Sequence, residues 1–166
     1  MTLQFRSRIM LVAAVVLVLA ADRAHAQPTL LPAEVPAFAL DVTAGQSLVG
    51  FRDYGRSGMQ GAIGAEVTLD EDLALRTQVE AGTVTMVTTG FQFRTRRRGP
   101  RGRTSREAGI GAVHAPGGWR SAFYFGGTAD HYFSNGSRAL TVRGRVYLGS
   151  YNAGLSLSLG YKWLFR

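Results

Sequence analysis

The chain has 166 residues, a formal net charge of +8 and no cysteine, so an exported form has to fold without disulfides. Its 21 glycines favour strands and turns over helices. Without residues 1–26, sixteen basic and ten acidic residues remain, and seven of the basic ones lie between positions 94 and 106. Because the excess charge belongs to one segment, the composition argues against a general nucleic-acid-binding surface.

The N-terminus is typical of a secretory signal peptide. Arg6 and Arg8 precede an uninterrupted apolar run over residues 9–20, and Ala24-His25-Ala26 supplies the small residues that a signal peptidase reads. The run is too short to cross a bilayer as a helix. We therefore predict a cleaved signal peptide over residues 1–26, a lead-in over residues 27–36 and one domain over residues 37–166.

Four strands are predicted in the first half of this domain, because apolar and polar side chains alternate there with a period of two. In the first strand Phe38, Leu40 and Val42 oppose Asp41. The second and third flank an acidic turn at residues 70–72, which places Glu66 opposite Arg76. The spans are residues 37–50, 58–69, 73–82 and 86–95, with one long strand over residues 73–95 as the alternative for the last two.

An Arg-rich segment from Arg94 to Arg106 follows. Gly99, Pro100 and Gly102 interrupt it, so we predict a flexible connection rather than a strand. Strand counting places it on the periplasmic side, whereas one long strand over residues 73–95 places it outside the cell. The segment is either a solvated loop or an anion-binding loop for lipopolysaccharide phosphates or anionic wall components, with the candidate residues Arg96, Arg97, Arg98, Arg101 and Arg103.

Four further strands are predicted at residues 106–114, 119–131, 138–149 and 153–165. In the last one, the odd-numbered residues from Ala153 to Phe165 are apolar and the even-numbered ones are mostly small or polar. No second apolar stretch reaches the roughly 18 residues that a transmembrane helix needs, so a membrane-bound form has to be a closed barrel. The predicted fold class is an all-β, eight-stranded antiparallel transmembrane up-and-down β-barrel.

The charged residues of the predicted strands lie almost entirely on the polar face. Five are acidic and six are basic, so a narrow lumen lined by them is close to neutral, as buried charges require. Barrel closure places Asp41 and Lys162 at similar depth across the seam between the first and last strands. The predicted lumen ion-pair network consists of Asp41, Glu66, Arg76, Glu80, Arg94, Glu107, Arg120, Asp130, Arg143, Arg145 and Lys162.

Two segments resemble the strand–turn–strand units of the OmpA-like and opacity-type family of small, porin-like outer-membrane barrels. In both, a Gly-rich strand enters a short polar turn and leaves through alternating Leu and Arg. The ending Tyr161-x-Trp163-x-Phe165 is similar to the signal that barrel-assembly machinery reads, although Arg166 follows the phenylalanine. The resemblance implies an outer-membrane fold with roles from structural anchoring to surface adhesion, and it rests on Gly64-Ala-Glu-Val-Thr-Leu-Asp-Glu-Asp-Leu-Ala-Leu-Arg76 and Gly126-Gly-Thr-Ala-Asp-His-Tyr-Phe-Ser-Asn-Gly-Ser-Arg-Ala-Leu-Thr-Val-Arg143.

We predict no catalytic site, metal site or cofactor. His131, Ser134 and Asn135 approximate the His-x-Ser-Asn element of outer-membrane lipid A deacylases, but the spacing differs and no acidic residue follows Asp130. His114 and His131 lack companions at ligand spacing. The acidic turn at residues 70–72 lacks the spaced ligands and the glycine of a calcium loop.

The sequence thus predicts a monomeric, non-enzymatic outer-membrane barrel with a structural or surface-interaction role. Its expected partners are outer-membrane lipid or lipopolysaccharide and the barrel-assembly machinery. Side chains such as Arg120, Tyr124 and Tyr147 fill so narrow an interior, so no large pore is expected. The alternatives are a soluble periplasmic or secreted β-barrel or sandwich that binds a small ligand and, third, a lipid A-modifying enzyme.

Overall fold

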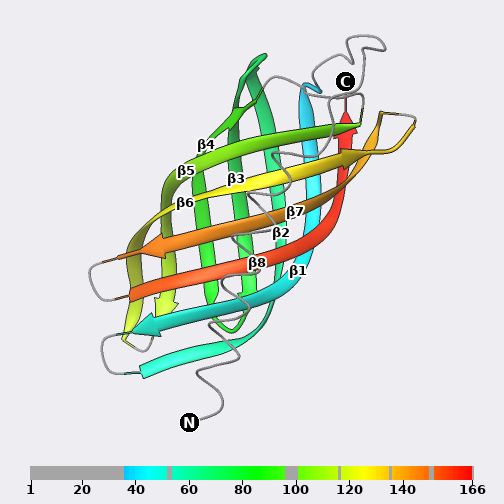
Figure 1. Cartoon of the computed structure of the whole chain (residues 1–166). Coiled ribbons are helices and arrows are strands. Elements are labelled where there is room, and N and C mark those ends of the chain that lie inside the picture. Colours follow the sequence, from blue (N-terminus) through cyan, green and yellow to red (C-terminus); the bar gives the residue numbers. More distant parts are fainter. Residues whose placement is uncertain are drawn as a thin grey trace.

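The computed structural model describes residues 36–51, 54–95, 101–115, 117–134, 136–149 and 152–165. Within them, eight antiparallel strands form a closed barrel in which β1 also pairs with β8 (Figure 1). The predicted signal peptide, Arg96 to Arg98, Asn135 and Arg166 lie outside the described residues. The strands are β1 (Phe38–Phe51), β2 (Tyr54–Asp70), β3 (Leu73–Gly82), β4 (Thr85–Arg94), β5 (Gly102–Ala115), β6 (Gly118–Tyr132), β7 (Arg138–Leu148) and β8 (Asn152–Phe165).

All eight predicted strands are present, and the predicted fold class is confirmed. The alternative of one strand over residues 73–95 is wrong, because β3 and β4 form a hairpin in which Val79 pairs with Val87. The predicted bounds of the flexible connection, Arg94 to Arg106, are wrong, since Arg94 ends β4 and Gly102 begins β5, while residues 96–100 lie outside the described residues. Apolar and polar side chains do not alternate over residues 102–105. Backbone pairing with β6 nevertheless extends β5 as far as Gly102, which pairs with His131.

The predicted register of both tested strand pairs is confirmed. Glu66 on β2 lies opposite Arg76 on β3, and Asp41 on β1 lies opposite Lys162 on β8. Because side chains alternate between the two faces of a strand, a correct register also places the correct side chains on the inner face. The alternation read from the sequence therefore fixes which residues line the barrel.

The barrel is polar inside and apolar outside. In β4 every second residue is buried, and the buried residues include Thr88, Gln92 and Arg94. The outward side chains are large and apolar: Ile63 is 65% exposed and Phe123 is 69% exposed. This distribution is the reverse of a water-soluble domain and suits a lipid environment. No helix in the described part of the chain is long and apolar enough to cross a membrane.

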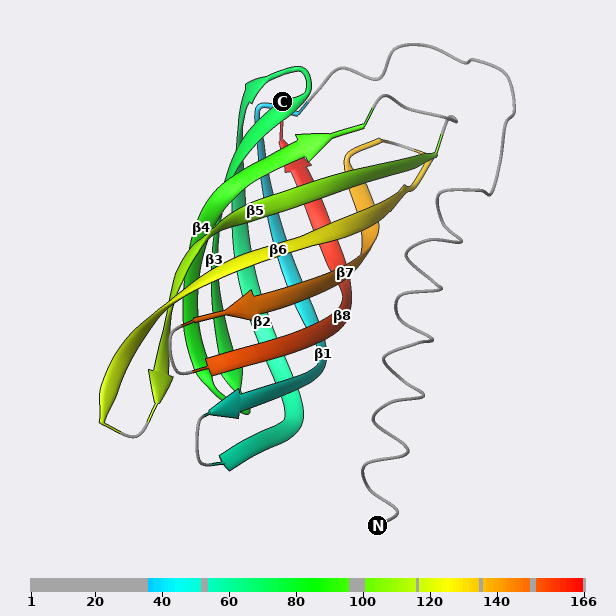
Figure 2. The same cartoon turned by 60° about the vertical axis from the view of Figure 1, so that its left-hand side comes forward.

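The two ends of the barrel differ in their connections. We call the end where β1 begins and β8 finishes the terminal end; it also holds the connections at residues 71–72, 95–101 and 133–137. The opposite end holds only connections of two or three residues, at 52–53, 83–84, 116–117 and 149–151. Figure 2 shows the β5–β6 hairpin extending beyond its neighbours at this opposite end.

Glycines allow the tight turns at the opposite end. Gly117 and Gly118 have φ angles of 91° and 112°, and Gly82 has a φ of 139°. A Cβ at Gly82 would lie 2.3 Å from the backbone oxygen of Met59. L-residues with a Cβ rarely adopt such conformations, so these positions depend on glycine.

Candidate functional site

The charged lumen is the most prominent group of functional side chains in the structure. Ten of the eleven predicted lumen residues are buried, five of them acidic and five basic, so the formal charges of this set cancel. Every strand contributes at least one of them, and together they connect all eight strands through the interior. They are Asp41, Glu66, Arg76, Glu80, Arg94, Glu107, Asp130, Arg143, Arg145 and Lys162.

Lys162 organises the layer of the network nearest the terminal end. Its ammonium donates to Asp130 Oδ2 at 2.7 Å and to Glu66 Oε2 at 3.1 Å. Arg94 also donates to Glu66 and, at 2.8 Å, to Thr68. Glu66 on β2 thus joins β4 and β8, neither of which is its neighbour in the sheet.

Asp41 lies at the centre of the next layer. Arg76 Nη2 donates to Asp41 Oδ2 at 2.6 Å, and Arg143 Nη2 donates to Asp41 Oδ1 at 3.3 Å. Both guanidinium groups also donate to Gln78 Oε1, at 3.0 and 2.6 Å. Asp41 and Lys162 are neighbours in register but make no ion pair with each other, because each finds partners across the lumen.

The third layer centres on Arg145. Its Nε and Nη2 donate to the two carboxylate oxygens of Glu107 at 2.6 and 2.9 Å, which is a bidentate pair. Its Nη1 donates to Glu80 at 3.2 Å, and Tyr147 donates to the same oxygen at 2.7 Å. Buried charges are tolerated when they are paired and hydrogen-bonded in this way, and losing one member leaves its partners uncompensated.

Inward-facing glycines create the space that these large side chains occupy. A Cβ at Gly64 would lie 2.2 Å from Arg76 Nη2, so an alanine there collides with the guanidinium. A Cβ at Gly109 would lie 2.7 Å from the ring of Tyr124, which packs directly against that glycine. The density of glycine in the sequence therefore reflects room for arginine and tyrosine inside the barrel as well as turns.

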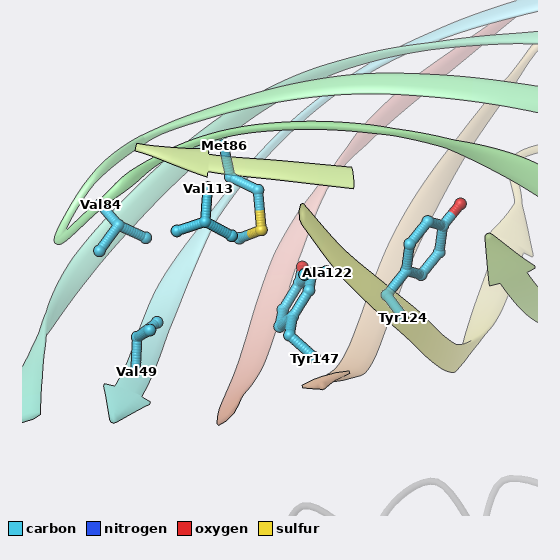
Figure 3. Packing of buried hydrophobic residues seen from close by; sticks show 7 residues of the cluster. All are labelled: Val49, Val84, Met86, Val113, Ala122, Tyr124 and Tyr147. Atoms are coloured by element: carbon cyan, nitrogen blue, oxygen red, sulfur yellow. The ribbon is translucent and has the colours of Figure 1, made fainter. Parts of the chain in front are cut away.

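Apolar clusters lie beyond the charged layers on both sides. Toward the opposite end, seven buried side chains converge in the interior (Figure 3): Val49, Val84, Met86, Val113, Ala122, Tyr124 and Tyr147. Toward the terminal end the cluster consists of Ala39, Tyr132, Ala139 and Leu164. Between them, a cavity of about 10 Å³ lined by Thr43, Gln60 and Ser156 is large enough for one water molecule.

Arg120 does not belong to the lumen network, and that prediction is wrong. It shares a face of β6 with the buried Ala122 and Tyr124, but its side chain is exposed. Among the described residues, the pairing of β6 with β7 begins at Phe123 opposite Leu148, so Arg120 lies on a stretch of β6 that pairs there with β5 alone. The alternation assigned the correct face, but it gave no information on where the neighbouring strand ends.

The arginines of the Arg-rich segment separate into different environments. Arg94 is in the lumen, while Arg101 and Arg106 are exposed. Arg103 reaches the β2–β3 turn, where Nη2 donates to the backbone oxygen of Glu71 at 3.3 Å and lies 4.0 Å from Asp72. The described part of the segment is therefore not one uniform cationic loop.

The residues that suggested an enzyme do not converge. His131 is exposed on the outer face, whereas the adjacent Asp130 is buried and bonded to Lys162. Ser134 is exposed in the β6–β7 connection, where Gly136 has a φ of 66° and donates its N–H to Phe133 O at 2.9 Å. No group of three or more potential metal ligands occurs among the described residues.

The aromatic residues at the end of β8 form an outward-facing band. Tyr161 and Trp163 pack edge to face with ring centroids 4.9 Å apart. Phe165 lies 5.7 Å from Phe38 across the closing seam, and Phe133 lies 5.9 Å from Tyr161. An aromatic belt at this level is typical of a membrane–water interface.

The sequence matches no protein-family model and no curated protein. Its structure is similar to solved eight-stranded membrane barrels, which confirms the predicted resemblance at the level of the fold. The crystal structure of neisserial surface protein A has a TM-score of 0.63 and 12% identity, covering 80% of this chain and 100% of that one. The N-terminal β-barrel domain of OprF from Pseudomonas aeruginosa has a TM-score of 0.57 and 10% identity, covering 78% and 100%.

Two other matches limit what this likeness means. Ail, the attachment invasion locus protein of Yersinia pestis, in complex with the heparin analogue sucrose octasulfate, has a TM-score of 0.54 and 11% identity, covering 80% of this chain and 100% of that one. A de novo designed transmembrane β-barrel has a TM-score of 0.55 and 12% identity, covering 78% and 97%. Because a designed chain matches as well as natural ones, the likeness identifies an architecture and carries no activity with it.

Proposed function

We propose that this protein is an exported, non-enzymatic outer-membrane barrel that acts as a structural or surface-interaction element and does not conduct solutes. The observation that carries the proposal is the interior: five acidic and five basic side chains pair with one another between two apolar clusters. A filled interior leaves little room for a solute. The apolar outer face, the predicted signal peptide and the fold of the similar structures support a membrane location.

Cell fractionation combined with a denaturing gel tests the membrane location. We expect the protein in the outer-membrane fraction and a band whose mobility changes when the sample is boiled, because folded barrels resist the detergent at low temperature. A soluble periplasmic protein whose mobility does not depend on heating supports the small-ligand binder instead.

Planar-bilayer recording tests the absence of a pore. We expect no large, stable conductance from the purified barrel. A variant in which Arg145 and Glu107 are both replaced by alanine is a useful positive comparison, because it removes the bidentate pair from the centre of the lumen. Large conductance from the natural protein contradicts the proposal.

Among structural and interaction roles, the short connections favour anchoring over display of long adhesive loops. Those of the opposite end span only two or three residues. By strand order the terminal end then faces the periplasm, and the Arg-rich connection with it. Trypsin treatment of intact cells tests this orientation: the Arg-rich connection stays uncut if it is periplasmic, and cleavage there reverses the assignment.

The Arg-rich connection is the candidate for anion binding, through Arg96, Arg97, Arg98 and Arg101. The described contacts make Arg103 a weaker contributor than the sequence suggested, because it already binds the acidic β2–β3 turn. Binding of anionic cell-wall fragments to the natural protein and to a variant with Arg96 to Arg98 replaced by glutamine tests this role. Equal binding by both proteins counts against it.

A further inference from the structure

Charge is unevenly distributed around the terminal end of the barrel. The exposed acidic residues of the described chain all lie in the β2–β3 turn, at positions 70–72. The side formed by β5, β6 and β7 carries no exposed acidic residue among the described ones. It carries four exposed cationic or titratable side chains, which we call the basic rim: Arg101, Arg106, His131 and Arg138.

Arg106 is the member of the basic rim that faces the lipid side of the wall. Its neighbours on β5, Ser105 and Glu107, are buried, so its own side chain points outward. It lies between Phe93 on β4 and Gly127 on β6, and it makes no hydrogen bond or ion pair with any described residue. An outward arginine with no partner among the described residues requires an anion or water at its guanidinium.

The residues on either side of Arg106 place it at the edge of the apolar band. Toward the rim, the hydroxyls of the next outward pair, Thr95 and Thr104, lie 2.7 Å apart. Away from the rim, the outward residues of β5 are apolar as far as His114. Eight residues of a strand tilted by about 40° span roughly 20 Å along the membrane normal, close to the apolar band of such barrels. Arg106 and His114 therefore mark the two edges of the band on β5.

On the β6 and β7 side of Arg106, two glycines leave the outer surface low. Gly127 lies opposite Arg106 in the ladder, and Gly144 lies opposite Gly127 on the next strand. Phe125 and His131 lie on the same face of β6, on either side of this low area. The aliphatic stem of Arg106 is thus able to lie along the wall while its guanidinium reaches toward the interface.

We propose that the basic rim binds the phosphate of an anionic phospholipid headgroup. Arg106 supplies a forked donor at the edge of the apolar band, and Arg101 and Arg138 supply the surrounding positive field. The low surface at Gly127 and Gly144 accommodates the glycerol and the first part of the acyl chains. The inference rests on the proposed membrane function, in which the terminal end faces the phospholipid leaflet rather than lipopolysaccharide.

Native mass spectrometry of the refolded barrel with added lipid tests the site. We expect phosphatidylglycerol to bind more tightly than phosphatidylcholine, and Arg106→Gln to weaken phosphatidylglycerol binding about fivefold. The triple variant R101Q/R106Q/R138Q should weaken it roughly a hundredfold if the three charges act independently. The matched control is Arg56→Gln, an exposed arginine near the opposite end, which should leave the affinity unchanged.

Two results overturn the site. One is equal affinity of the natural protein and the triple variant for phosphatidylglycerol; the other is full displacement of the lipid by an excess of inorganic phosphate, which means that a free anion suffices. Failure of the proposed function gives a different result, because the natural protein then does not insert into vesicles and shows no heat-dependent mobility. A barrel that inserts equally well with and without phosphatidylglycerol, and binds it no better than phosphatidylcholine, overturns the site alone.

Discussion

Arg94 and Arg106 begin and end the same Arg-rich segment, and the fold gives them opposite environments. Arg94 is 7% exposed and donates to Glu66 and Thr68 inside the barrel. Arg106 points outward beside Phe93 and makes no ion pair with a described residue. The pairing of Arg94 with Ser105 across the β4–β5 hairpin places Ser105 on the inner face and the next residue on the outer face.

The comparison teaches that register, and not residue type, decides what an arginine does in this barrel. An inward arginine completes a neutral network, and its loss leaves a buried acid without its partner. An outward arginine at the edge of the apolar band costs little at that depth and remains available to a ligand. Side chains that complete the buried network should therefore be far more sensitive to substitution than side chains without a role in it.

The largest effect on the free energy of unfolding is expected for the buried acidic residues. Glu107→Ala removes the bidentate partner of Arg145, and we expect a loss of about 3–5 kcal/mol in the free energy of unfolding. Glu71→Ala, in the exposed β2–β3 turn, should change it by less than about 0.5 kcal/mol. Urea unfolding in lipid vesicles, followed by the fluorescence of Trp119 and Trp163, measures both variants; similar losses contradict the buried network.

Reversing the charge of Glu66 should also cause a large loss in the free energy of unfolding. The structure limits how much of this loss the opposite change at Arg76 is able to restore. The sequence suggests that exchanging the two residues restores part of the loss, since they face each other in register. Glu66 also binds Arg94 and Lys162, while Arg76 binds Asp41. We therefore expect the exchanged variant to recover little stability, and full recovery in the unfolding experiment means that the facing pair acts alone.

The next largest difference in the free energy of unfolding is expected between variants of Arg94 and Arg106. Arg94→Gln removes a charged hydrogen bond to Glu66, and we expect a loss of about 2–3 kcal/mol. Arg106→Gln should change the free energy of unfolding by less than about 0.5 kcal/mol in vesicles of neutral lipid. Equal losses in that lipid show that Arg106 has a structural role, and the contrast between the two residues then fails.

Glycines on β5 provide a smaller, steric contrast. Gly109→Ala places a Cβ 2.2 Å from the backbone oxygen of Thr89 and 2.7 Å from the ring of Tyr124, and we expect a loss of about 1–3 kcal/mol. Gly102→Ala, with no heavy atom within 4 Å of the added Cβ, should be close to neutral. Midpoints of urea unfolding for the two variants decide the matter, and a neutral Gly109→Ala shows that the strand is able to shift.

The smallest contrast concerns two tyrosines of the same apolar cluster. Tyr147→Phe removes a 2.7 Å hydrogen bond to Glu80, and we expect a loss of about 1 kcal/mol. The hydroxyl of Tyr124 is buried and has no hydrogen-bond partner among the described residues, so Tyr124→Phe should be neutral or stabilising. A larger loss for Tyr124→Phe than for Tyr147→Phe indicates that the hydroxyl of Tyr124 is the better hydrogen-bonded of the two.

Sequence patterning determined the strands, their inner and outer faces and the facing pair Glu66 and Arg76, because strand side chains alternate with a period of two and a short turn fixes the register. Ten of the eleven predicted lumen residues are on the inner face and buried for this reason. Arg120 is the exception, since the place where β7 stops pairing with β6 leaves no mark on the sequence of β6 itself.

Only the tertiary structure decided which charges meet. Arg143 and Asp41 are 102 positions apart in the chain, yet they bond across the lumen. Lys162 passes over its register neighbour Asp41 to bind Glu66 and Asp130. The physical reason is that closing eight strands around a narrow interior brings long side chains from non-adjacent strands within reach of one another, whereas local alternation specifies only the face from which each side chain starts.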